Sequence, residues 1–218
     1  MTTTESLKSA RTAAFFAFLF HALGLVVALF GIRFGTAVFT PEQRMAFVAT
    51  SPWGWKAAWG VWLIAAVTFV WFLARVEKTW DASGGTARLS LIIGVVAASL
   101  DIVFDTLQIV VLPAVAARGP EARQVFLALA HFASSGGIVV ANGLYAVSVA
   151  LMTHAIRAQL SKVQLWCGWS VLAAGLLLTA AGFFEDPHLP EIFAGPAIGT
   201  YMLWVAALAW FGPSSAKP

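Results

Sequence analysis

The sequence has few charged residues and a single cysteine. Of its 218 residues, only 11% are Asp, Glu, Lys or Arg, whereas soluble domains carry about 25%. Hydrophobic residues make up 60% of the chain, and the mean hydropathy is +0.85. The shortage of charge excludes an ordinary soluble domain and indicates a membrane protein. Because Cys167 is the only cysteine, no internal disulfide can form, and a structural zinc site is not expected.

Several chemical signatures are also missing. The sequence contains no phosphate-binding Walker loop, no Gly-x-Ser-x-Gly elbow, no His-Glu-x-x-His motif and no pair of histidines spaced to share one helix face. Its 13 Lys and Arg residues do not form a basic run with interleaved aromatic residues, so we expect no nucleic-acid partner. No metal site and no cofactor are predicted.

The hydrophobic residues occur in blocks of about 20, which is enough for a helix to cross a hydrocarbon core of ~30 Å. The blocks lack strict alternation, which favours helices over a closed barrel. We therefore predict an all-α polytopic membrane protein with a single six-helix transmembrane domain over residues 12–211. The six spans are expected at about 12–34, 53–75, 89–113, 123–145, 164–184 and 192–211.

The segments outside the spans have their own predictions. Residues 1–11 are expected to be a disordered cytoplasmic tail, and residues 212–218 a polar C-terminal tail. The first apolar block exceeds the ~7–15 residues of a signal-peptide core, which favours an uncleaved anchor. After it, a Thr-Pro-Glu sequence predicts the start of a short interfacial helix over about 41–49. Residues 185–191 are predicted to be an acidic loop.

The basic residues predict the orientation of the chain in the membrane. With six spans, the side that holds both termini has eight of them: Lys8, Arg11, Arg75, Lys78, Arg88, Arg157, Lys162 and Lys217. The opposite side has five: Arg33, Arg44, Lys56, Arg118 and Arg123. Because basic loops stay in the cytoplasm, both termini are expected there. The expected location is a bacterial inner (plasma) membrane.

Two aspartates lie near the middle of the third predicted span. Asp101 and Asp105 are four residues apart and so share one helix face. They lie about 18 and 12 Å from the outer end of that span at 1.5 Å per residue. A central aspartate costs about 2.5–3.5 kcal/mol on insertion scales, and two like charges also repel. At least one is therefore expected to bind a proton, unless both share a cation or a protonated histidine. The alternative is a structural hydrogen-bonded pair.

A second polar stripe lies on the fourth predicted span. In an antiparallel hairpin with its turn near residue 118, Asp105 faces the level of His131 and Asp101 that of Ser135, with His21 at a similar depth. His21 and Tyr145 also have ordinary explanations, a helix–helix hydrogen bond and the aromatic belt. The candidate catalytic residues are Asp101, Asp105 and His131, and the candidate substrate-binding residues are Gln108, Ser134, Ser135, Asn142, Tyr145 and His21.

Small residues interrupt two of the spans. The Ser-Ser-Gly-Gly sequence at 134–137 predicts a kink or local unwinding beside a cavity, although small residues also let helices pack closely. In the sixth span, Gly195 and Gly199 are spaced as in helix-dimer motifs, a weak indication of a homo-oligomer.

These residues leave several functions open. The leading hypothesis is a small transport or permeation protein whose midplane Asp/His site handles a proton, a cation, or an amine-like or apolar small molecule. The alternative is an intramembrane enzyme on a lipid-like or isoprenoid-like substrate, with an aspartate as general acid and His131 as its partner. A further alternative is a haem-binding electron-transfer subunit ligated by His21 and His131, or a scaffold subunit. The central layer has almost no Lys or Arg, which argues against a phosphate or sulfate substrate. The expected partners are the lipid bilayer and a small molecule or ion.

Overall fold

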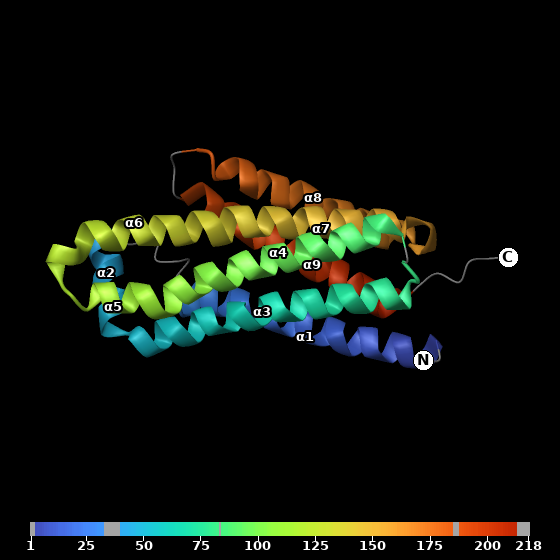
Figure 1. Cartoon of the computed structure of the whole chain (residues 1–218), viewed down its shortest axis with the longest axis horizontal. Helices are drawn as coiled ribbons and strands as arrows, with labels where there is room; N and C mark the ends of the chain where they lie inside the picture. Colours follow the sequence, from blue (N-terminus) through green and yellow to red (C-terminus); the bar gives the residue numbers. More distant parts are fainter. Residues whose placement is uncertain (1–2, 33–39, 83, 185–187, 213–218) are drawn as a thin grey trace.

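The computed structural model describes residues 3–32, 40–82, 84–184 and 188–212. Within these ranges the chain is all-helical, and six helices are long and apolar enough to cross a membrane, which confirms the predicted class. These helices run along the long axis of the molecule (Figure 1). The α-helices are α1 Thr3–Phe30, α2 Pro41–Thr50, α3 Pro52–Thr79, α4 Gly85–Thr106, α5 Leu112–Ala116, α6 Arg123–Ser134, α7 Asn142–Ala155, α8 Lys162–Ala181 and α9 His188–Phe211.

The third and fourth spans each contain a π-helical stretch, in which backbone hydrogen bonds skip five residues instead of four. The first π stretch, Leu107–Val111, joins α4 to α5, and the second, Ser135–Ala141, joins α6 to α7. With these stretches included, the third span extends over Gly85–Ala116 and the fourth over Pro120–Ala155.

Ser90 and Ser148 define the register of the third and fourth spans. Each π turn takes up one additional residue, and because each of the two spans contains one such stretch, the two additions offset each other in the pairing across the hairpin. Ser90 on α4 is paired with Ser148, two residues beyond the Ala146 that the count predicts. The two serine hydroxyls donate to each other's backbone carbonyls at 2.7 and 2.8 Å, and both side chains are fully buried. This reciprocal pair holds α4 and α7 in the shifted register.

The first helix begins earlier than predicted, so the expected disordered tail is corrected: the chain is helical from Thr3 onward. The Ser6 and Thr79 hydroxyls lie 3.0 Å apart, and Arg11 Nε donates to the Ala209 carbonyl at 3.1 Å. Small side chains of the same helix are buried against α3 and α9, namely Ala10, Ala13, Ala14 and Ala17. These contacts stabilise the N-terminal part of α1, which its polar residues alone would predict to be a disordered tail.

The last helix also begins earlier than predicted. Of the expected acidic loop, residues 185–187 lie outside the described part of the chain, whereas residues 188–191 form the first turn of α9. The start of α1 and the end of α9 lie at the same end of the bundle, and α2 and α5 lie at the opposite end (Figure 1).

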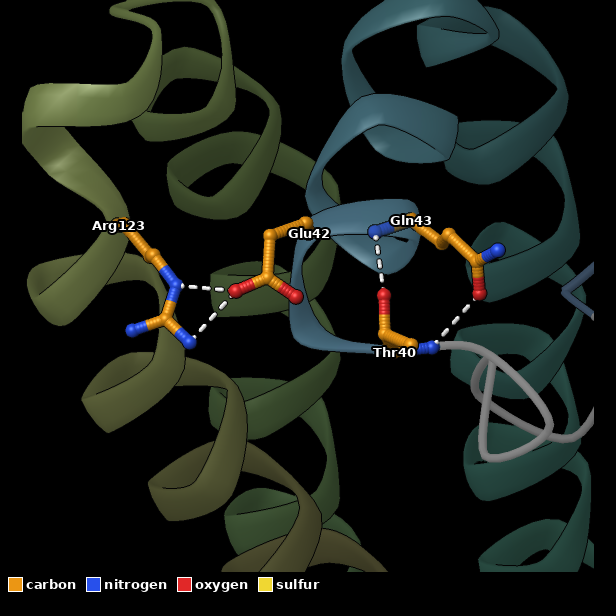
Figure 2. Close-up of polar contacts among 4 residues, drawn as sticks. All are labelled: Thr40, Glu42, Gln43 and Arg123. Atoms are coloured by element: carbon orange, nitrogen blue, oxygen red, sulfur yellow. Dashed lines mark hydrogen bonds and ion pairs between the residues drawn. The ribbon is translucent and has the colours of Figure 1, made fainter.

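Helix α2 has the start that its sequence predicts. The Gln43 backbone N–H donates to Thr40 Oγ1, and the Thr40 N–H donates to Gln43 Oε1, which forms a capping box (Figure 2). Glu42 accepts from Arg123 of α6 at 2.6 Å. The backbone N–H of Glu42 and this guanidinium hold the pKa of the Glu42 carboxyl below its ordinary value. A surface location for α2 in the membrane stays a prediction.

The interior is divided into two apolar clusters. One lies towards the end with the termini and includes Phe69, Phe72 and Trp204. The other lies towards the α2 end and includes Trp55 and Phe126. The polar residues of the third and fourth spans lie between the two clusters, about halfway along the bundle.

Candidate functional site

A cavity of about 120 Å³ lies between the two apolar clusters, bounded by α1, α3, α4, both π stretches, α6, α7 and α9. Its lining brings together residues that are far apart in the sequence. The predicted site residues that line it are His21, Asp101, Asp105, Gln108, Ser134, Asn142 and Tyr145.

The two carboxylates have different surroundings. Asp101 is half-buried, and the Tyr145 hydroxyl donates to its Oδ2 at 3.1 Å. A Cβ added to Gly137 would lie 3.6 Å from Asp101 Oδ1, so this oxygen is close to the second π stretch. Asp105 is only 2% exposed, and its Oδ2 has no hydrogen-bond partner within the described part of the chain.

Gln108 lies next to Asp105 on the same face, one turn further along. Its side chain is 1% exposed, and neither its amide nitrogen nor its amide oxygen has a partner among the described residues. Buried polar groups are almost always hydrogen-bonded, and leaving one unsatisfied costs about 1–3 kcal/mol. The unpaired atoms of Asp105 and Gln108 therefore mark the deep part of the cavity as a site that a polar group from a ligand or solvent would satisfy.

His21 contributes a ring with one defined tautomer. Its Nδ1 lies 2.7 Å from the Ala17 carbonyl oxygen, and because a carbonyl only accepts, Nδ1 carries the hydrogen. In the neutral ring, Nε2 is then an acceptor. The His21 ring packs against Tyr201, with centroids 4.5 Å apart and planes tilted by 51°, and makes an edge contact with Trp62 at a centroid distance of 6.3 Å. The hydrogen bond of His21 is thus within its own helix and is not the helix–helix bond considered from the sequence.

The first π stretch is explained by the proline that follows it. In a π-helix the carbonyl of Gln108 would accept from residue 113, but Pro113 has no N–H. The Leu112 N–H donates to the Leu107 carbonyl, which leaves the Gln108 carbonyl without a partner in its own helix. The buried Trp55 of α3 donates its Nε1–H to this carbonyl at 2.7 Å. This bond anchors the backbone from which the Gln108 side chain extends.

The second π stretch coincides with the Gly-Gly sequence. The segment predicted as a kink or unwound turn is a widened but continuous helix. The Asn142 side chain donates to the Gly137 carbonyl at 3.2 Å, and so stabilises the π stretch from within. A Cβ at Gly136 would lie 2.0 Å from the Phe104 ring. The glycine therefore allows Phe104, which lies between the two aspartates in sequence, to pack directly on the fourth span.

Two predicted site residues do not line the cavity. His131 is exposed on the outside of the bundle, and Ser135 is half-buried elsewhere on the fourth span. Counting along a hairpin estimates depth but not the rotation of each face, and Ser134 and Gly137 face the cavity instead. His21 and His131 are consequently not brought together around one cavity, as joint haem ligands would have to be.

Aromatic residues that were not predicted as site residues form part of the cavity wall. Trp59 and Trp62 of α3 and Phe104 of α4 all line it. Trp55, Trp59 and Trp62 are spaced by four and three residues, which places them on one helix face. This spacing was visible in the sequence, but tryptophans at the start of a span are also typical of the headgroup level.

The described residues contain no group of three or more His, Cys, Asp or Glu side chains that could hold a metal ion. The cavity instead combines two carboxylates, two amides, a serine hydroxyl, a phenol and an imidazole with a mainly aliphatic and aromatic wall. Comparison of the chain with models of known protein families, with curated proteins and with solved structures gives no significant match.

Proposed function

We propose that this chain is a small membrane transport or permeation protein whose midplane cavity binds a proton or a cation through Asp101 and Asp105. One observation carries the proposal: both carboxylates line a single cavity halfway along a bundle of apolar helices. Ionisable residues at membrane depth are costly and generally mark ion or substrate pathways. The lining contains no Lys or Arg, so the site would attract positive charge and repel anions.

The irregular helices beside the cavity support movement of the ligand. Each of the two spans that carry the polar residues has a π stretch at the cavity. Such stretches are frequent at functional sites, and irregular backbone at membrane depth is tolerated where it lines a cavity. In this proposal, the two π stretches are the places where the third and fourth spans change shape as the ligand passes.

Transport assays of aspartate variants test the proposal. Purified protein is reconstituted into liposomes that contain a pH-sensitive dye, and alkali-metal or alkylammonium cations are added outside under an imposed potential. We expect the dye to report a cation-dependent proton flux with the parent protein. This flux should fall at least tenfold in Asp101→Asn and in Asp105→Asn, because each variant loses a carboxylate at the cavity. Asp81→Asn is the matched control, since Asp81 is exposed and has a positive φ of 46° that asparagine accepts.

Normal flux in both cavity variants would rule the proposal out, provided that they elute from size exclusion and unfold as the parent does.

The second candidate function is an intramembrane enzyme. The hydrogen bond from Tyr145 to Asp101 Oδ2 favours it, because it fixes the position of a carboxyl group that lines the cavity and could exchange a proton with a bound substrate. Turnover of a lipid-like substrate in detergent, with no gradient present, would distinguish the enzyme from the transporter.

A further inference from the structure

The polar atoms at the deep end of the cavity define the charge of a ligand. Asp105 Oδ2 and Gln108 Oε1 are buried acceptors, Gln108 Nε2 and Trp59 Nε1 are buried donors, and none of these four atoms has a partner among the described residues. The half-buried Asp101 adds a second carboxylate to the same cavity. An anion would face two carboxylates with no Lys or Arg in the lining, and a neutral apolar molecule would leave the buried acceptors unpaired. A cation that carries N–H donors is attracted by the two carboxylates and pairs with the two buried acceptors.

The rest of the wall defines the body of the ligand. Apart from the polar residues, the cavity is lined by aliphatic and aromatic side chains, including Trp59, Trp62, Phe104 and Ile138. A bare metal ion would gain no coordination from such a wall, because hard cations prefer shells of several oxygen ligands. Alkyl groups gain from burial against it, and ring faces attract ammonium groups.

The size of the cavity limits the ligand further. Its volume is about 120 Å³, somewhat less than the ~150 Å³ of an engineered cavity that binds benzene. A ligand of about five non-hydrogen atoms therefore matches the space.

We propose that the cavity binds a small primary or secondary alkylammonium ion. Its N–H groups donate to Asp105 and Gln108, and its short alkyl chain packs against Trp59, Trp62 and Phe104. This inference rests on the proposed function, of which it names the substrate class. Asp101, hydrogen-bonded to Tyr145, supplies the second negative charge in the same cavity.

Calorimetric titration of the purified wild-type chain in detergent tests the proposal with four probes. The probes are n-butylammonium, tetramethylammonium, 1-butanol and butyrate, which separate the N–H donors, the positive charge and the alkyl chain. We expect n-butylammonium to bind at least tenfold more tightly than tetramethylammonium and 1-butanol, and butyrate not to bind. Equal affinity for 1-butanol or for tetramethylammonium would overturn the proposal without any substitution being made.

Variants then locate the site. Asp105→Asn should weaken n-butylammonium binding at least tenfold and Gln108→Leu at least threefold, whereas the control Asp81→Asn should bind as the parent does. Unchanged binding in folded Asp105→Asn and Gln108→Leu would overturn the assignment of the deep end.

The result is separable from the transport proposal. Selective n-butylammonium binding without flux in liposomes would keep the ligand class and reject transport. An aspartate-dependent flux of another cation, with no n-butylammonium binding, would keep transport and reject the ligand class.

Discussion

Gly136 and Gly137 illustrate how much a single atom matters at this site. They are neighbours in the second π stretch, yet they face different surroundings. An added Cβ at Gly136 would lie 2.0 Å from the Phe104 ring, whereas at Gly137 the nearest atoms, Phe104 Cβ and Asp101 Oδ1, would be 3.5 and 3.6 Å away. The first distance requires Phe104 to move, and the second is ordinary van der Waals contact.

Gly136→Ala should therefore destabilise the protein by about 1–3 kcal/mol, the usual cost of overpacking. The substitution would also disturb the edge contact of Phe104 with Phe132, whose ring centroids are 5.3 Å apart. Gly137→Ala is the matched control and should be neutral or slightly stabilising, because alanine favours a helix. Thermal unfolding in detergent measures both variants. Equal stability of the two would show that Phe104 does not pack on Gly136.

At the scale of elements, the first π stretch depends on a contact from another helix. Pro113 cannot donate to the Gln108 carbonyl, and the Trp55 indole takes the place of the missing N–H at 2.7 Å. An unsatisfied buried acceptor costs about 1–3 kcal/mol, so the indole stabilises the irregular backbone beside Asp105. The sequence separates the two partners by 53 residues, which is why inspection of either helix alone does not reveal the bond.

A double-mutant cycle isolates this bond. Trp55→Phe should destabilise the protein by about 1–3 kcal/mol in addition to the loss of side-chain volume. In a Pro113→Ala background the new N–H can donate to the Gln108 carbonyl, so the same substitution should cost less. The volume lost is equal in both backgrounds and cancels.

Unfolding equilibria in a mixed-detergent titration measure the four variants of this cycle. Trp53→Phe is the control, because Trp53 is 80% exposed and precedes the buried face of α3. If Trp55→Phe costs the same with and without Pro113, the indole does not compensate for the proline.

At the scale of the whole molecule, the helix arrangement is the same for either orientation in the membrane. The distribution of Lys and Arg residues therefore predicts which end of the bundle faces the cytoplasm. The start of α1 and the end of α9 lie at the same end of the bundle (Figure 1), and the prediction that both termini are cytoplasmic concerns this end. The count of eight basic residues on that side against five on the other supports a cytoplasmic location for it.

Labelling of single cysteines tests this orientation. Cys167 is the only native cysteine, so Cys167→Ala provides a cysteine-free background. Into it we would place Gly84→Cys, at the end that carries the termini, or Glu121→Cys, at the α2 end; both positions are exposed. Neither substitution changes the number of Lys and Arg residues.

In intact cells a membrane-impermeant maleimide should label the cysteine at position 121. It should reach the cysteine at position 84 only after the membrane is opened. The reverse pattern would place the termini outside.

Composition and spacing alone determine the class of this protein and the number of its spans. A bilayer requires every backbone polar group to be satisfied within the protein and each helix to have about 20 apolar residues, and both requirements are visible in a one-dimensional pattern. The same pattern places Asp101, Asp105 and Gln108 on one stripe, because helical periodicity depends only on residue number. Seven of the nine candidate site residues named from the sequence line the cavity.

Tertiary structure alone decides which way each helix faces. Lipid tails and the bundle interior are both apolar, so hydropathy does not distinguish the two faces of a span. His131 is consequently exposed although counting placed it near Asp105. The third and fourth spans contain π stretches, and Ser90 pairs with Ser148, two residues beyond the position that counting gives. The tryptophans of α3 form part of the cavity wall. These features arise from contacts between helices, above all the packing of Phe104 on Gly136 and the bond from Trp55 to the carbonyl that Pro113 cannot satisfy.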